Sequence, residues 1–156
     1  MIAVELVRAR GHPLVRASHR STLEVTTDAT LTPRGDCIVA VAADKSASQL
    51  SAGFKCLAAR EGARIEVVLS CGGLKEVIRA SGSSSLRFTD PRSMVVRRSG
   101  FVDGRTVAVR SDKAAADIDR ELVRCLQRGA ELRILLVAYA PEAEADALRL
   151  LRVLPI

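Results

Sequence analysis

Aromatic residues are scarce in this sequence, whose 156 residues include no tryptophan, one tyrosine and three phenylalanines. Proteins that stack bases on their surface need several exposed aromatic side chains, so this composition argues against a base-stacking platform. Long apolar runs are missing as well. The longest runs, such as 134–138, have the length of a strand and fall far short of the ~20 residues that a membrane-spanning helix needs.

A signal peptide is not expected either. The first ten residues alternate charged and apolar side chains and contain no continuous apolar core, which a signal peptide requires. Hydrophobic residues make up 48% of the chain and charged residues 27%, so it is neither disordered nor fibrous. We therefore expect a cytoplasmic protein that makes no contact with a membrane and is long enough for one domain.

Cysteine occurs in no metal-binding or disulfide-rich spacing. The four cysteines lie far apart, at Cys37, Cys56, Cys71 and Cys125. Because no two of them form a CxxC pair, a zinc ribbon is excluded and a disulfide framework is not expected. Cys37, Cys56 and Cys125 fall within apolar patterns, so we predict that their thiols are buried and unreactive.

Lysine is scarce among the basic residues, so the formal net charge of +6 comes mostly from arginine. The planar guanidinium suits phosphate and carboxylate groups, although a GC-rich genome produces the same bias. Residues 8–20 contain four arginines and no acid, and residues 75–110 contain eight basic residues and three acids. These stretches either merge into one positive surface for RNA or a phosphate-bearing ligand, or form ordinary solvated faces.

The two halves of the sequence resemble each other. Residues 4–25 align without a gap on residues 75–96, with identical residues at several matched positions: Glu5 and Glu76, Arg8 and Arg79, Gly11 and Gly82, Arg16 and Arg87. After a connection that is shorter in the second half, residues 39–69 match residues 107–136 with one further single-residue shift. Matches in the same order and at a nearly constant offset predict two copies of one unit.

Each copy, about 2–71 and 73–139, has the pattern of three strands, a helix and a closing strand. Alternating and β-branched runs predict the strands, at 2–9, 22–27, 38–42 and 65–69 and at 74–80, 93–98, 106–110 and 132–139. A one-sided apolar stripe predicts each helix, within 47–58 and 115–126.

One copy cannot bury a sheet face and a helix stripe alone, so the two copies are expected to share a core. The predicted fold class is therefore α+β: a (β-β-β-α-β)x2 duplication that forms one β-rich, sandwich-like or barrel-like domain over residues 1–156, with two helices packed on it.

Residues 141–154 have no counterpart in the first copy and predict a third, C-terminal helix. Pro141 suits the first helical position, and Glu142 and Glu144 suit the first turn. Its apolar stripe either caps the domain or docks a second subunit in a homodimer.

Residues kept in both copies are candidates for the scaffold, and residues found in one copy are candidates for a site. Asp44 and Asp112 occur in both, where a helix is expected to begin, so we predict that their carboxylates cap the helices.

His12 and His19 occur only in the first copy, seven residues apart across a turn. One hypothesis is that they act as acid–base groups with Asp36, or bind a metal with Asp36 or Asp90. The alternative is one ordinary loop histidine and one at the edge of a strand.

Three arginines are candidates for ligand or phosphate binding. Segment 32–37 is specific to the first copy, and its proline and glycine predict a tight turn that presents Arg34 and Asp36. Arg97 and Arg98 stand where the first copy has threonines. Adjacent residues of a strand point to opposite faces, so one of this pair is expected to face inward and to need a partner. The alternative for segment 32–37 is a tight turn with a structural role only.

Several of these segments match a known family signature: residues 11–12, 19–24, 31–37, 94–99 and 112–115. Together they resemble an archaeal family known as domain of unknown function 371, also called Mth639-like. Ser21 stands where the family would have threonine, so the hydroxyl is kept. The resemblance implies a cytoplasmic archaeal protein with a β-rich, sandwich-like core, and it implies no activity, cofactor or catalytic residue.

Three functions are therefore open. The first is a binding module for RNA or a phosphate-bearing ligand, and the second is a small enzyme that uses His12, His19 and Asp36, with Arg34 or Arg98 holding an anion. The third is an assembly partner that acts through its C-terminal helix. The sequence contains no nucleophile elbow, P-loop or dinucleotide fingerprint and names no cofactor.

Overall fold

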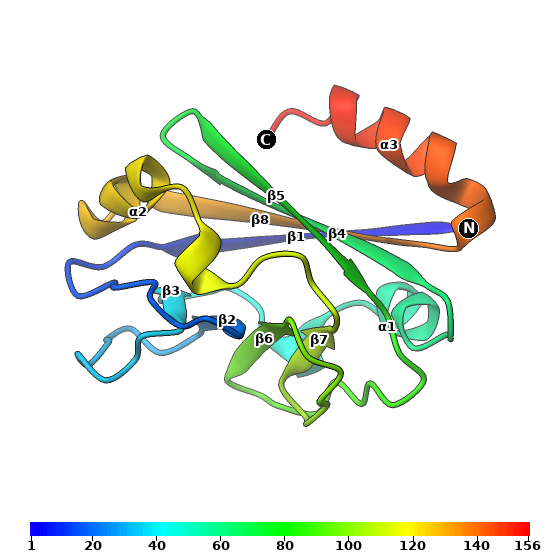
Figure 1. Ribbon diagram of the computed structural model, residues 1–156, viewed down its shortest axis with the longest axis horizontal. Helices are drawn as coiled ribbons and strands as arrows, with labels where there is room; N and C mark the ends of the chain where they lie inside the picture. Colours follow the sequence, from blue (N-terminus) through cyan, green and yellow to red (C-terminus); the bar gives the residue numbers. More distant parts are fainter.

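A computed structural model describes residues 1–156 and contains two four-stranded sheets and three helices (Figure 1). The large sheet is antiparallel and has the order β1 (Ile2–Arg10), β8 (Glu131–Tyr139), β4 (Arg64–Cys71), β5 (Leu74–Ser81). The small sheet has the order β3 (Ile38–Ala40), β2 (Thr22–Thr26), β6 (Ser93–Arg97), β7 (Thr106–Ala108). The eight strands lie within two residues of the predicted ranges, and the predicted α+β class is confirmed.

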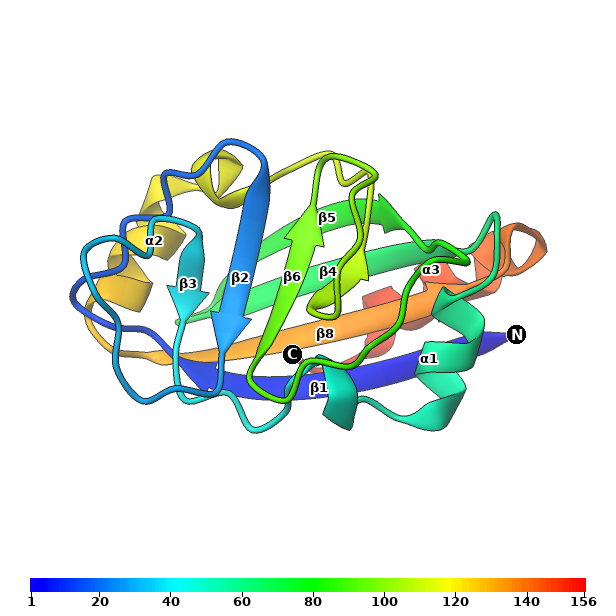
Figure 2. The same ribbon diagram turned by 90° about the horizontal axis from the view of Figure 1, so that it is seen from below.

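The two sheets stack as a sandwich. They do not close into a barrel, which was the alternative that the sequence allowed. Figure 2 shows the strands of the small sheet running across those of the large sheet. Two short helices, α1 (Ala52–Ala58) and α2 (Arg120–Gln127), lie at opposite ends of the small sheet. Each follows a short 3-10 turn, so each predicted apolar stripe is split between a turn and a helix.

The core lies between the sheets and includes the buried stripes of α1 and α2. It contains 38 buried residues from both halves of the chain. Phe54 of α1 is fully buried and packs edge-on against Phe88 of the second half, with ring centroids 6.3 Å apart. Burial of one such side chain contributes roughly 1.5–3 kcal/mol, so contacts across the halves supply much of the stability.

Matching contacts occur in the two halves. The carboxylate of Asp44 accepts a hydrogen bond from the Arg8 amide at 3.0 Å, and that of Asp112 accepts one from the Arg79 amide at 2.9 Å. The prediction that these aspartates cap helices is therefore wrong, because each instead ties a strand of the large sheet to the segment leading into a 3-10 turn. Ser51 and Asp119 provide the caps of α1 and α2.

The loops that follow β1 and β5 pack against the helix of the other half. Gly11 lies so close to the carbonyl oxygen of Leu126 in α2 that a β-carbon would clash with it. Gly82 lies in the same relation to the carbonyl oxygen of Ala58 in α1. These two close approaches explain why both halves have glycine at this point.

Helix α3 (Glu144–Val153) covers part of the outer face of the large sheet (Figure 1). Its Ala147 is fully buried in a small cluster with Val68, Leu135, Val137 and Tyr139. The helix therefore caps the domain, while its proposed use as a dimer contact stays a prediction. None of the helices is both long enough and apolar enough to cross a membrane.

Substitution of either contact glycine is expected to destabilise the fold. Gly11→Ala and Gly82→Ala each force the backbone apart, so each should lower the free energy of unfolding by about 1–3 kcal/mol. Gly53→Ala is the control, because its β-carbon meets no atom within 4 Å and alanine favours a helix by about 1 kcal/mol. Urea denaturation measures all three, and a Gly11→Ala protein as stable as Gly53→Ala would contradict this account.

Candidate functional site

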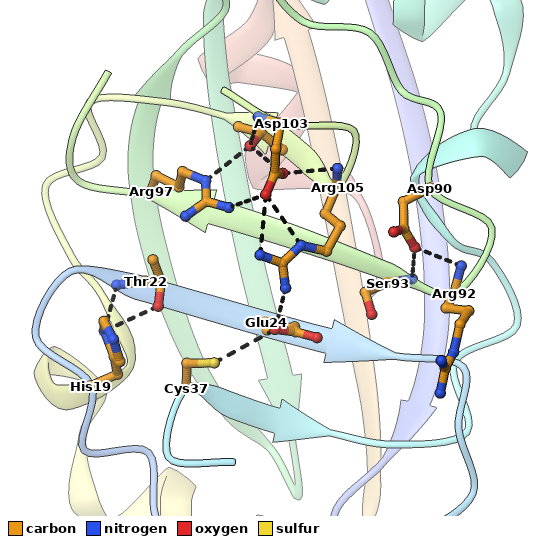
Figure 3. A network of polar contacts seen from close by, with 11 residues as sticks. His19, Thr22, Glu24, Cys37, Asp90, Arg92, Ser93, Arg97, Asp103 and Arg105 are labelled. Atoms are coloured by element: carbon orange, nitrogen blue, oxygen red, sulfur yellow. Dashed lines mark hydrogen bonds and ion pairs between the residues drawn. The ribbon is translucent and has the colours of Figure 1, made fainter. Parts of the chain in front are cut away.

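The outer face of the small sheet carries a network of polar side chains (Figure 3). At its centre Arg97 of β6 is only 8% exposed. Its Nε donates to Thr106 Oγ1 at 2.9 Å and its Nη2 to Asp103 Oδ2 at 2.9 Å. The guanidinium carbon also lies 4.9 Å from the centre of the Phe101 ring. Arg97 thus has partners, but it lies on the outer face of the small sheet and not toward the core. These hydrogen bonds use two of its five N–H groups.

The network continues from Arg105 across to β2. Arg105 donates to Asp103 at 3.1 Å and to Glu24 at 3.4 Å. Burial opposes ionisation of Asp103, but hydrogen bonds from Arg105 and the charges of Arg97 and Arg105 outweigh it and lower the pKa of Asp103 to about 2. Asp103 is therefore ionised at neutral pH and pairs with both arginines.

Cys37 lies at the other side of this network, with its thiol 3.6 Å from Glu24. Burial and the nearby Glu24 charge raise the pKa of Cys37 to about 11, so the thiol stays protonated and unreactive. The prediction of buried thiols is confirmed for Cys125, holds only in part for the half-buried Cys37, and is wrong for Cys56, which is exposed on α1. Cys56 belongs to the polar side of that helix because Phe54, Leu57 and Ala58 form its buried side.

His19 and Asp90 have the same structural role at the start of β2 and β6. His19 Nδ1 accepts from the Ser21 and Thr22 amides at 3.2 and 3.1 Å. Asp90 Oδ1 accepts from the amides of residues 92 and 93 at 2.8 and 2.9 Å. Both side chains therefore close a turn, and Nδ1 of His19 must be unprotonated to do so.

His12 and Asp36 also make local contacts. His12 Nδ1 accepts from the Leu14 amide at 3.0 Å, and the backbone carbonyl of Asp36 accepts from the amides of Ser18 and His19. The segments of Asp36 and His19 thus lie side by side, but no hydrogen bond links either residue to His12. No three His, Cys, Asp or Glu side chains are grouped to hold a metal ion, so the metal hypothesis gains no support from the geometry.

The three arginines proposed as ligand contacts are not gathered into one site. Arg97 is paired with Asp103, Arg98 donates to Asp117 at 3.1 Å, and Arg34 is exposed in the turn before β3. The neighbouring Arg92 pairs with Asp28 at 2.7 Å. The positive charge of the small sheet is therefore largely neutralised by the protein's own carboxylates.

A second polar group lies on the outer face of the large sheet, beside the start of α3. Its cavity of about 170 Å³ contains charged groups of both signs and is lined by Arg64, Glu66, Arg79, Ala80, Ser81, Arg110, Tyr139 and Glu144. We call it the arginine–glutamate cleft. Strands β4, β5 and β8, the residues after β7 and the first residue of α3 all contribute to it.

Glu66 is the unusual residue of this cleft. It is 1% exposed, and its Oε1 is the one buried side-chain oxygen or nitrogen in the protein without a hydrogen-bond partner. Arg79 Nε lies 3.3 Å from that oxygen, close enough for an ion pair but not oriented as a hydrogen bond. Burial raises the pKa of Glu66 in spite of Arg79, with help from Asp112 and Glu144.

An unsatisfied buried carboxylate destabilises a fold, at a cost of roughly 1–3 kcal/mol or more. Such groups are rare in native proteins and cluster at functional sites. Three arginines line the same cavity, and among them only Arg79 is paired with a carboxylate. Arg110 has a left-handed backbone conformation, with φ 51°, and its guanidinium lies beside Gly100.

The opposite end of the large sheet provides a comparison. There Arg8 of β1 is the register partner of Arg133 of β8, as Arg79 of β5 is the partner of Glu66. Arg133 donates to Glu131 at 2.9 Å on the open surface. No buried acceptor remains without a partner at that end, so the unsatisfied carboxylate is particular to the cleft.

Comparisons with known proteins agree with the resemblance found in the sequence. A family described as domain of unknown function (DUF371) matches residues 7–139. The chain belongs to the DUF371 family. An uncharacterised protein of Methanocaldococcus jannaschii is 39% identical over 127 residues, which cover 81% of this chain and 93% of that protein.

All the residues that line the cleft except Glu144 lie within the part of the chain that matches the DUF371 family. Sequence patterns placed Arg79 and Arg110 in a basic stretch and matched Arg79 with Arg8, whereas Arg64 and Glu66 did not stand out. One signal was available, because Glu66 is a lone acid inside an apolar strand and the residue that aligns with it in the second half is Arg133.

The depressed pKa of Asp103 predicts a pH-dependent contribution to stability. A carboxyl group whose pKa is lower in the folded protein stabilises it above the unfolded pKa, and this stabilisation is lost as pH falls through the folded value. Asp103→Asn should therefore lower the free energy of unfolding by about 1–2 kcal/mol at pH 7, after a discount for partial exposure.

The difference from wild type should shrink as pH falls from about 4 to about 2, in urea denaturation over a pH series. Asp146→Asn is the control, because Asp146 pairs with Arg149 on the open surface. A loss that is equal at pH 7 and near pH 2 would show that the charge of Asp103 is not the cause.

Proposed function

We propose that this protein is a binding module for a small phosphate-bearing ligand, which it holds in the arginine–glutamate cleft. The observation that carries the proposal is the convergence of Arg64, Arg79 and Arg110 on one cavity that also contains an unsatisfied carboxylate. Guanidinium groups bind phosphate through two parallel hydrogen bonds. Arginines on three different segments can therefore contact several oxygens of one phosphate.

The dimensions of the cleft favour a small ligand over RNA. A cavity of about 170 Å³ has room for one phosphate group, given that a water molecule takes roughly 30 Å³. RNA binding needs an extended basic surface, often with exposed aromatic side chains. The arginines of the small sheet are mostly paired, and Phe101 is the one aromatic side chain that is exposed.

The other two functions have weaker support. The contacts of His12, His19 and Asp36 are local ones that close turns, and no cavity unites these side chains as an acid–base site would require. An assembly role for α3 depends on apolar surface left over after the helix packs on the large sheet. Neither hypothesis is supported by a buried polar atom without a hydrogen-bond partner, such as Glu66 Oε1.

We also infer that the chain is one domain that arose by duplication of a unit of about 70 residues, at 2–71 and 73–139. The matched strand order and the paired contacts of Asp44 and Asp112 support this inference. The cytoplasmic location stays part of this proposal.

Inorganic phosphate is the simplest ligand with which to test the cleft. Isothermal titration of the full chain should show one site, and Arg79→Ala should weaken binding about tenfold to a hundredfold, because a hydrogen bond between charged groups is lost. The matched control is Arg8→Ala, which removes an arginine from the equivalent place at the other end of the large sheet.

Binding to the Arg8→Ala protein should match wild type. Equal losses in the two variants would indicate a general charge effect, and no loss with Arg79→Ala would contradict the assignment of the cleft.

A further inference from the structure

The hydrogen-bonding needs of the cleft are not all met by a simple anion. Glu66 forms an ion pair with Arg79, and in its ionised form the carboxylate only accepts hydrogen bonds, so Oε1 needs a donor. Arg79 Nε is near that oxygen but is not aimed at it. A ligand whose oxygens are all unprotonated would place another acceptor against Glu66. Two negative charges, one on the ligand oxygen and one on the buried carboxylate, would then repel each other.

A phosphate group that keeps one proton has the matching chemistry. Its unprotonated oxygens accept hydrogen bonds from arginine, while its P–OH group donates one. Inorganic phosphate carries such a proton at neutral pH. Sulfate has nearly the same shape and charge but no proton, and the phosphodiester of a nucleic acid has none either. A phosphate monoester keeps its second proton only below a pH of about 6.

We infer that Glu66 accepts a hydrogen bond from a protonated oxygen of the ligand, so that the cleft selects inorganic phosphate, or a monoester that keeps its proton, over sulfate and phosphodiesters. This inference rests on the proposed function. It names the class of ligand and assigns Glu66 as a residue that determines specificity.

The remaining residues of the cleft supply the donors that such a ligand needs. Arg64 lies on the same strand as Glu66, Arg79 on β5, and Arg110 follows β7. Burial raises the pKa of Tyr139, with further contributions from Glu66 and Glu144, so its hydroxyl stays protonated. The cleft therefore presents several donors and two carboxylates, of which Glu66 is buried and Glu144 is exposed. Hydrogen phosphate offers acceptors to the donors and one P–OH donor to Glu66.

Two neighbouring carboxylates complete the electrostatic setting. Glu144 of α3 lines the cleft, and Asp112 acts on Glu66 from nearby. Both make it harder for the cleft to accept an anion with no proton. Neither takes the place of a donor to Glu66, because each is itself an acceptor.

The test compares ligands of similar size on the full-length protein by isothermal titration near neutral pH. Inorganic phosphate should bind at least about tenfold more tightly than sulfate or dimethyl phosphate, because either of these leaves two acceptors facing each other. Methyl phosphate distinguishes the two sources of a protonated phosphate. Its affinity should rise as pH falls through about 6, whereas inorganic phosphate should bind well above that pH.

Glu66→Gln is the decisive variant, because the amide has nearly the same shape and can donate. It should bind sulfate as tightly as phosphate, and a thermal melt should show that it folds. If this variant fails to fold, the ratio of phosphate to sulfate affinity in the wild-type protein still tests whether the cleft selects a protonated ligand.

The outcomes separate this inference from the function on which it rests. Equal binding of phosphate and sulfate by the wild type would overturn the role of Glu66 and leave the phosphate cleft in place. Selectivity that persists in Glu66→Gln would also overturn it. If none of these anions binds, both the role of Glu66 and the proposed phosphate cleft are overturned.

Discussion

The fold depends on how the strands of the large sheet alternate between the two halves of the chain. In the order β1-β8-β4-β5, every neighbouring pair joins a strand from the first half to a strand from the second. Neither half can therefore complete the hydrogen bonds of this sheet by itself, and unpaired strand edges are costly and prone to association. The glycine contacts between the loops and the opposite helices reinforce the same dependence.

This alternation also explains where the cleft lies. Glu66 and Arg64 come from the first half, Arg79 and Tyr139 from the second, and pairing of β4 with β5 and β8 places them on one face. The segment after β7 then contributes Arg110 from the side of the small sheet. The two ends of the large sheet have similar backbones but different side chains, so one end retains an unsatisfied carboxylate and the other has a surface ion pair.

Local sequence patterns predicted the strands and the buried helix stripes well, since alternation and apolar spacing are read within one element. Contacts between distant elements were harder to predict. Asp44 and Asp112 stand just before helical segments, yet their partners are the amides of Arg8 and Arg79 in strands far away in the sequence. Cys56 falls within an apolar pattern of the sequence, but α1 turns it away from the side that Phe54, Leu57 and Ala58 bury.

The candidate site was the least predictable part. Arg34, Arg97 and Arg98 stood out because they differ between the copies, but whether an arginine is free depends on acids that only the fold brings near, such as Asp103. Glu66 differs between the copies too, although its position inside an apolar strand hid it among core residues. The comparison of the two halves therefore separated some residues of interest, but it assigned Arg79 to the scaffold because Arg79 matches Arg8, and it carried no information on burial.

The most direct test of the cleft as the ligand site is to map the binding surface by NMR. Backbone amide shifts are recorded while inorganic phosphate is added to the full chain. The account predicts that the shifts gather at residues 64–66, 79–81, 110 and 139, with none of comparable size at residues 8–10 and 131–133 at the other end of the sheet. Shifts centred on the turn at 32–37 or on Arg97 and Arg98 would contradict it.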